Sequence, residues 1–292
     1  MSIPFTYVYD WGKIDGDWLP VFEAFAANGA KHLVFTEDMV NRIASHAPFR
    51  RTLAQYMEQN KLDFVDGHTP FEAEATLVAT DEIRPQMLLR QKFALQLMAD
   101  FGVKNCCVHV GRSFEYPNMT FADADINARK ALDELVPFAQ KLGVVICIEN
   151  IFNPINHLQE LHALMQDYRC DNFGFCYDCG HANIMENGKG FDDCLMYARW
   201  GMAGKKPEEI QWEKDTLNQM LPDIVMCHLH DNDARRDQHT LPGRGNIDFA
   251  REITTLRKAP RLTTFQSEVM PIRNDLSVAE LCSTWQDLMT KY

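Results

Sequence analysis

Short apolar runs alternate with longer segments of helical periodicity along the whole chain. Eight of these runs are rich in Val, Ile, Phe and Cys, and they are centred near Tyr7, Leu33, Phe64, Val108, Ile146, Phe175, Met226 and Phe265. Near-continuous apolar runs of this kind are typical of parallel strands that are covered on both faces. The pattern therefore predicts eight buried strands.

Helices are predicted between the strands, in segments whose apolar residues recur every three or four positions. Their ranges are 17–28, 49–60, 83–101, 122–142, 156–167, 249–256 and 278–289. Gly29, Gly102 and Gly143 each stand just beyond the last apolar position of such a segment. Because glycine readily adopts the left-handed conformation that ends a helix, these three positions are predicted helix ends.

Strands and helices alternate in the order of right-handed βαβ units, which build parallel sheets. Eight units predict an α/β fold with one domain over residues 1–292, a closed (β/α)8 TIM barrel. A doubly wound open sheet is the alternative. The connection between strands six and seven, residues 185–222, is long and contains several Gly together with Trp200 and Trp212. Long connections at a barrel rim are candidate lids.

The charge balance limits the classes of partner. The chain has 292 residues, with 29 Lys and Arg against 41 Asp and Glu, a formal net charge of −12. Proteins that bind nucleic acid usually carry the opposite sign, because neutralising phosphates supplies much of their affinity. The balance therefore argues against nucleic acid as a partner. Apolar residues make up 46% of the chain, which is enough for a large core.

No targeting segment is recognised in the sequence. The first residues, MSIPFTYVYDWGK, have neither the basic region nor the apolar stretch of a signal peptide. No run approaches the roughly 18 apolar residues of a spanning helix, so no membrane partner is expected. The nine cysteines lie mostly inside apolar runs and are interpreted as buried free thiols in a reducing compartment. A cytoplasmic protein is predicted.

Most of the predicted strands end in residues of the types that bind metals or transfer protons. These residues are Asp10, His68, His109, Glu149, Asp178, His181, His228, His230 and Glu268. The carboxyl ends of parallel strands lie at one rim of a barrel, and barrel active sites are built there. A site at this rim is the strongest functional prediction from the sequence.

A metal shell is predicted where four consecutive strands end, at Glu149, Asp178, His228 and Glu268. A lone carboxylate at a strand end more often caps the next helix, but the joint occurrence at successive strands favours a shared ligand. Three carboxylates and one imidazole suit a divalent ion such as Mn, Co, Zn or Mg. Further metal or substrate ligands are predicted at His68, His109, His181, His230, Asp237 and His239.

The strand-end sequences resemble the xylose isomerase-like TIM-barrel superfamily, which contains sugar phosphate isomerases and epimerases and also endonuclease IV. The resemblance covers essentially the whole chain. The matching stretches are IEN at 148–150, YDCGHAN at 177–183, HLHDND at 228–233, DQHTLPGRGNIDF at 237–249 and SEV at 267–269. They occur in the order and on the strands that the superfamily requires, so the resemblance also implies a TIM barrel.

The resemblance to the ketose 3-epimerases within this superfamily assigns roles to individual residues. It implies that the four predicted shell residues bind the metal, that His181 contacts sugar hydroxyls, and that Arg235 or Arg236 lies near the substrate. Glu149 and Glu268 are the predicted catalytic acid and base, because they stand on strands five and eight, across the ion from each other. The acidic residue that these epimerases place shortly after Glu149 is absent from the segment NIFNPIN at 150–156, which leaves the sugar specificity open.

The resemblance to endonuclease IV implies a different set of roles. That enzyme uses nine ligands for three zinc ions, and this chain has a suitable residue type at every one of those positions. They are His68, His109, Glu149, Asp178, His181, His228, Asp237, His239 and Glu268. The same loop pattern also occurs in superfamily members that act on sugars, so the ligand types alone do not imply three metals.

Three functional hypotheses follow. The first is a metal-dependent sugar isomerase or epimerase that removes a proton next to the carbonyl of a small sugar or polyol derivative, with the ion acting as a Lewis acid. The second is a metal-dependent phosphodiesterase that acts on abasic DNA, which the acidic charge disfavours. The third is a sugar-binding barrel without turnover, which the acid pair disfavours. A homo-oligomer, by default a dimer, is expected.

Overall fold

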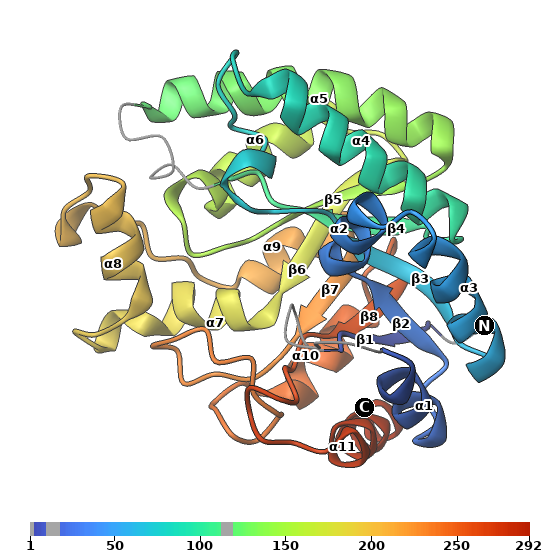
Figure 1. Ribbon diagram of the computed structural model, residues 1–292. Helices are drawn as coiled ribbons and strands as arrows, with labels where there is room; N and C mark the ends of the chain where they lie inside the picture. The colour runs from blue at the N-terminus through green and yellow to red at the C-terminus, as the bar shows by residue number, and fades with distance from the viewer. Residues whose placement is uncertain (1–2, 10–17, 112–118) are drawn as a thin grey trace.

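A closed barrel of eight parallel strands forms the centre of the molecule in the computed structural model, which describes residues 3–9, 18–111 and 119–292. The strands pair in chain order, and β8 pairs with β1 to close the barrel (Figure 1). Their bounds are β1 Phe5–Tyr7, β2 His32–Phe35, β3 Asp63–His68, β4 Asn105–Val108, β5 Val145–Glu149, β6 Phe173–Asp178, β7 Ile224–Leu229 and β8 Thr264–Ser267. The predicted TIM barrel is confirmed, and the open sheet is excluded.

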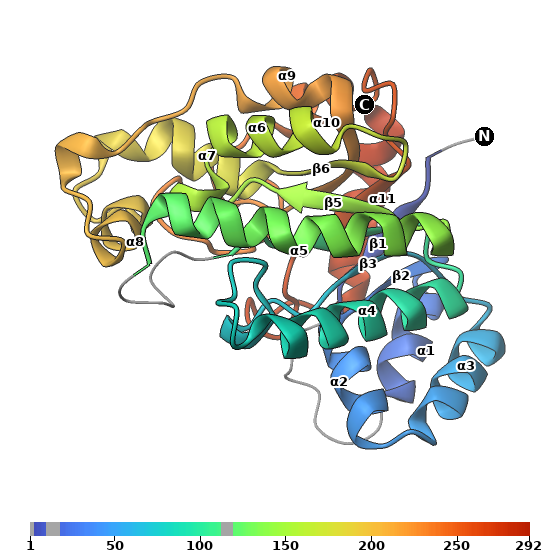
Figure 2. The same ribbon diagram turned by 90° about the horizontal axis from the view of Figure 1, so that it is seen from above.

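Helices surround the barrel on its outside, as the view from above shows (Figure 2). Seven of them match the predicted segments: α1 Leu19–Ala27, α3 Phe49–Asn60, α4 Arg84–Asp100, α5 Phe121–Leu142, α6 Leu158–Tyr168, α10 Phe249–Leu256 and α11 Val278–Lys291. Gly29, Gly102 and Gly143 follow α1, α4 and α5 with φ of 83°, 91° and 68°, so the predicted left-handed helix ends are confirmed.

Four shorter helices were not expected from the pattern: α2 Glu37–Ser45, α7 Cys179–Asn187, α8 Leu195–Met202 and α9 Thr216–Met220. Each has nine residues or fewer, although α10, which was predicted, has only eight. Short helices draw most of their stability from packing against the rest of the fold. Met39 and Ile43 of α2, for example, are buried in the main core.

The barrel interior differs from the apolar layer between strands and helices. On β5, Ile146 and Ile148 face the helices and belong to the main core, so Cys147 and Glu149 face the interior. Cys147 packs there with the other members of a small buried cluster, Cys107, Cys176, Val225 and Met226. All nine cysteines are free, as predicted, and all but Cys170 are buried. The Cys107 thiol lies 3.4 Å from Oε2 of Glu149, at the end of β5.

The long connection between β6 and β7 is itself folded. Besides α7, α8 and α9 it contains the short 3-10 turns Gly188–Gly190, Pro207–Glu209 and Leu221–Asp223. A separate apolar cluster holds α8 against the segment that follows β5: Ile151, Phe152, Ile184, Met185, Cys194, Met196, Trp200 and Ile210. The connection is therefore a packed rim element, and α8 stands out from the barrel beside the carboxyl ends of the strands (Figure 1).

Within the described residues, no helix has both the length and the apolar character needed to cross a membrane. The strand-end residue Asp10, which the sequence pattern added to the predicted rim, lies outside the described residues.

Candidate metal centre and active site

Four donor residues meet where β5 to β8 end. Glu149 and Asp178 are the last residues of β5 and β6, His228 lies near the end of β7, and Glu268 follows β8. Asp178 and His228 are also register partners across β6 and β7. One ligand atom from each of the four lies within 4.8 Å of all the others, so the group could hold a metal ion. The predicted shell residues are brought together.

The ionisable side chains of this group lie close to one another. The Nδ1 atom of His228 lies 2.7 Å from Oε1 of Glu149 and 3.2 Å from Oε1 of Glu268. Oδ2 of Asp178 lies 3.8 Å from the same nitrogen. All four side chains are buried, so three carboxylates share a small volume from which water is excluded. Such a set repels itself unless a positive charge lies between its members.

The pKa shifts show where that positive charge resides. Burial favours the neutral imidazole of His228, but Glu268 and Glu149 outweigh it and raise its pKa to about 9. Burial alone would raise the pKa of Glu149, yet His228 and His109 hold it well below its usual value. Imidazolium thus supplies the charge that balances the carboxylates. A divalent ion bound to the same oxygen and nitrogen donors supplies it more fully, so the donor set fits a metal.

Asp178 also caps a helix. Its Oδ1 atom accepts a hydrogen bond of 2.6 Å from the backbone N–H of His181, and this bond caps the start of α7. The general expectation that a strand-end carboxylate caps the next helix is therefore also met here. The cap fixes the orientation of the Asp178 carboxylate, since one of its oxygens is held by the helix backbone.

A second donor group extends from Glu149 toward β3 and β4. Its ligand atoms come from His68, His109 and Glu149, with the thiol of Cys107 alongside. Nε2 of His109 lies 2.7 Å from Oε2 of Glu149 and 3.1 Å from Nε2 of His68. The Nδ1 atom of His68 is 2.8 Å from the carbonyl oxygen of Thr69 and donates to it, which turns Nε2 toward the group. Burial holds the pKa of His68 well below its usual value, so the ring is neutral.

A third donor group consists of His181, His230, Asp237 and His239. His181 and His239 each direct Nδ1 to a backbone carbonyl, at 2.9 Å from Asn150 and 2.8 Å from Glu268. Their Nε2 atoms face the Asp237 carboxylate at 3.5 Å and 3.1 Å. Backbone carbonyls that orient imidazoles in this way are typical of metal-binding histidines.

The loop that carries Asp237 and His239 is held by a buried carboxylate. Asp231 accepts hydrogen bonds from four backbone N–H groups, and the donors are Asn232, Gly243, Gly245 and Ile247. A Cβ atom at Gly245 would lie 2.2 Å from the carbonyl oxygen of Asn232, so only glycine fits there. His239 itself has φ of 48°, in the left-handed region that non-glycine residues rarely adopt. Asp231 stabilises this bent path.

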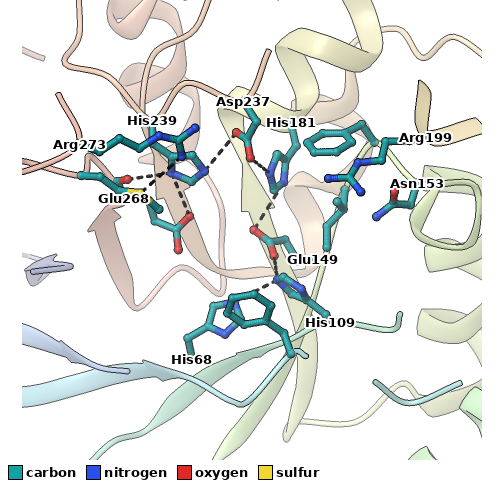
Figure 3. Close-up of a pocket in the computed structure, with 14 residues that line it drawn as sticks. His68, His109, Glu149, Asn153, His181, Arg199, Asp237, His239, Glu268 and Arg273 are labelled. Atoms are coloured by element: carbon teal, nitrogen blue, oxygen red, sulfur yellow. Dashed lines mark hydrogen bonds and ion pairs between the residues drawn. The ribbon is translucent and has the colours of Figure 1, made fainter. Parts of the chain in front are cut away.

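A pocket of about 210 Å³ opens above the donors. Glu149, Glu268, His181, Asp237 and His239 line it (Figure 3). Asp178 and His228 are fully buried and do not line it. The walls are completed by side chains from the rim segments: Phe71, Ile151, Phe152, Asn153, Arg199, Met270 and Arg273. The pocket suits a small molecule, because apolar walls with a few convergent polar groups are typical of such sites.

Ten of the predicted site residues converge on this region: Glu149, Asp178, His228, Glu268, His68, His109, His181, His230, Asp237 and His239. Arg235 and Arg236 do not. The Arg235 guanidinium packs over the Phe191 ring, and Arg236 is largely exposed, 3.8 Å from Asp193. Asp233 accepts from the backbone N–H of both arginines, which turns this part of the loop outward. Neither arginine lines the pocket described above.

Asn153, Arg199 and Arg273 line the pocket, and the sequence did not indicate them. Asn153 lies in the segment NIFNPIN, where only a missing acidic residue had been noted. Arg199 is on α8, and Arg273 follows β8 by several residues. No motif surrounds either arginine, so only the folded path of the chain brings them to the site.

The chain belongs to the xylose isomerase-like TIM barrel family, whose model matches residues 22–263. It is similar to the uncharacterised protein MJ1311 of Methanocaldococcus jannaschii, with 22% identity over 228 residues, which is 77% of this chain and 70% of that protein. A second relative, the uncharacterised protein y4fM of Sinorhizobium fredii, is 26% identical over 54% of this chain and 44% of its own length.

Solved structures share the fold over nearly the whole chain. A D-tagatose 3-epimerase-like protein has a TM-score of 0.72 with 16% identity and covers 99% of both chains. The IOLI protein with a bound zinc atom has a TM-score of 0.69, 16% identity and coverage of 98% of both chains. An AP endonuclease of family 2 from Brucella melitensis has a TM-score of 0.68 with 13% identity, over 98% of this chain and 99% of that one. At these identities the likeness establishes the barrel fold alone.

Proposed function

We propose that the protein is a divalent-metal-dependent sugar isomerase or epimerase, which removes and returns a proton next to the carbonyl of a small sugar or polyol derivative. The observation that carries the proposal is that the four residues of the predicted metal shell differ in their access to the pocket. Asp178 and His228 are fully buried, while Glu149 and Glu268 reach the pocket surface from β5 and from the end of β8. Two carboxylates of one shell therefore face the substrate.

The environments of the two carboxylates suit opposite proton-transfer roles. Imidazoles on two sides keep Glu149 ionised, whereas burial raises the pKa of Glu268, and the nearby Glu149 and Asp178 carboxylates raise it further. Paired groups whose environments differ in this way serve as base and acid. Nε2 of Gln266 donates a hydrogen bond of 3.0 Å to Oε1 of Glu268 and so fixes its direction. A bound divalent ion would polarise the substrate carbonyl as a Lewis acid.

His181 is positioned to act on substrate hydroxyls. Its Nδ1 donates to the Asn150 carbonyl, and its ring stands edge-on to Phe152 in the pocket wall. The two contacts hold Nε2 toward the cavity (Figure 3). Similar folds in a D-tagatose 3-epimerase-like protein and in the zinc-containing IOLI protein support this assignment of class.

Deuterium incorporation tests the proposal directly. The metal-loaded protein is incubated in deuterated water with a panel of ketoses, aldoses and keto-polyols. Deuterium is expected at the carbon next to the carbonyl of at least one compound, and Glu268→Gln is expected to lower the rate by about 10²–10⁴-fold. Glu213→Gln is the matched control, because Glu213 is equally buried but lies outside the pocket. Exchange with none of the panel would contradict the proposal.

A second candidate function is a metal-dependent phosphodiesterase. The observation that favours it is that the three donor groups described above are adjacent. The first and second share Glu149, and the first and third meet where His230 lies 3.2 Å from Asp178. Three ions at such groups could generate hydroxide and stabilise a leaving oxygen. The net charge of −12 and the small pocket argue for a small substrate instead.

Metal analysis separates the two candidates. The protein is purified without added metal, and its metal content is measured together with nicking of DNA that carries an abasic site. About one ion per chain and no nicking support the isomerase. Three tightly held zinc ions with metal-dependent nicking support the phosphodiesterase.

A further inference from the structure

Two guanidinium groups stand in the walls of the pocket, on either side of the carboxylate floor. Arg199 and Arg273 are the Lys or Arg residues among the described side chains that line it (Figure 3). The charged groups at the floor are the predicted metal donors, and in the proposed function they bind the ion. The guanidiniums lie outside that centre, where the remainder of a substrate would extend.

Arg199 is held in a defined position. It lies on α8, between residues Met196 and Trp200, which anchor this helix to the segment after β5. Its guanidinium carbon lies 5.8 Å from the centre of the Phe152 ring. A cation held against an aromatic wall is preorganised, because little freedom is lost when a ligand binds.

Asn153 adds a second polar group on the same wall. Its side chain lines the pocket, yet only 3% of the residue is exposed, and its Oδ1 atom has no hydrogen-bond partner. A buried acceptor without a partner costs free energy, and a hydroxyl group of a ligand is a donor that would complete it. Figure 3 draws both side chains on the same side of the pocket. The two residues form the polar part of this wall.

Arg273 differs from the arginines on the outer surface. Arg235 and Arg236 face the carboxylate of Asp193 at 3.8 Å, whereas no carboxylate within the described residues forms an ion pair with Arg273. Its contact at 3.7 Å is the Sδ atom of Met270, another pocket residue. An exposed cation at the mouth attracts a negatively charged ligand.

We infer that the substrate carries a compact anionic group, a carboxylate or a phosphate, which binds to Arg199 while the carbonyl end faces Glu149 and Glu268 and a hydroxyl between them donates to Asn153. This inference rests on the proposed function and adds the class of substrate, an acidic sugar derivative. The planar guanidinium matches either oxyanion through two parallel hydrogen bonds. Arg273 covers the mouth from the opposite wall. A neutral sugar would bring no counter-charge to Arg273.

Binding measurements test the anionic subsite. Hexose 6-phosphates, hexuronates and their neutral parent hexoses are titrated by calorimetry into the metal-loaded protein. At least one anionic sugar is expected to bind 10- to 100-fold more tightly than its parent, and Arg199→Met is expected to abolish that difference. Arg235→Met is the matched control and should keep it. The compound that gains most identifies the anion as phosphate or carboxylate.

The outcomes also separate this inference from the proposed reaction. Equal binding of anionic and neutral sugars, or a preference that survives Arg199→Met, overturns the subsite. Deuterium exchange in the same samples reports on the reaction independently. Arg199-dependent binding without exchange retains the subsite and rejects the isomerase, whereas exchange of neutral sugars that is unchanged in Arg199→Met does the reverse.

Discussion

The Nδ1 atom of His228 lies 2.7 Å from Oε1 of Glu149, although β6 lies between the strands that carry them, β7 and β5. The buried pair links the first donor group to the second, because Oε2 of Glu149 faces His109. We predict that Glu149→Gln keeps the fold but lowers the metal content by at least tenfold, since an amide is a poor ligand. Elemental analysis and circular dichroism measure both. Full metal content in this variant would remove Glu149 from the shell.

The affinity for metal should depend on pH. Buried carboxylates raise the pKa of His228 and of His239 to about 9, although burial itself acts the other way. Below pH 9 each imidazolium must therefore release its proton before it can bind an ion. We expect the apparent affinity to fall about tenfold per pH unit for each displaced proton as the pH decreases from 9 to 6. Titrations against a competing chelator provide the measurement, and a constant affinity over this range would contradict the prediction.

Asp231 should be required for the third donor group. Asp231→Ala removes the acceptor of four backbone N–H groups, and we expect a loss of about 3 kcal/mol in the free energy of unfolding. Because the loop carries Asp237 and His239, metal bound at that group should be lost as well. Asp233→Ala, which removes two such bonds in the same loop, is the graded control and should cost less. Equal stabilities of the two variants would mean that Asp231 does not hold the loop.

The buried carboxyl group of Glu213 should make the free energy of unfolding depend on pH. Its carboxylate accepts hydrogen bonds from Leu158 N and Thr216 Oγ1, but burial still raises its pKa from 4.5 to about 7. Between these values the unfolded chain ionises while the folded protein keeps the proton, so rising pH destabilises the fold. Glu213→Gln lacks this effect and should gain about 3 kcal/mol relative to the wild type between pH 4.5 and 7. Denaturant titrations at both pH values would show a constant difference if the prediction is wrong.

The barrel and its donor residues could be predicted from the sequence because their placement follows from strand direction alone. Once eight parallel strands are recognised, Glu149, Asp178 and His228 must share a rim. Arg199 could not be found in this way, because its position depends on how α8 packs against Phe152, far away in the sequence. Arg235 does not line the pocket for a related reason: its backbone N–H is held by Asp233 and its guanidinium packs over Phe191, and neither contact can be read from the sequence.

The apolar cluster beneath α8 is separate from the main core, and this separation has an evolutionary consequence. A lineage can replace the segment around Arg199 without disturbing the strands that carry the acid and the base. Gene duplication followed by changes in this one insertion would yield enzymes with the same chemistry and different substrates. Divergence between close homologues is therefore expected to concentrate in residues 188–212.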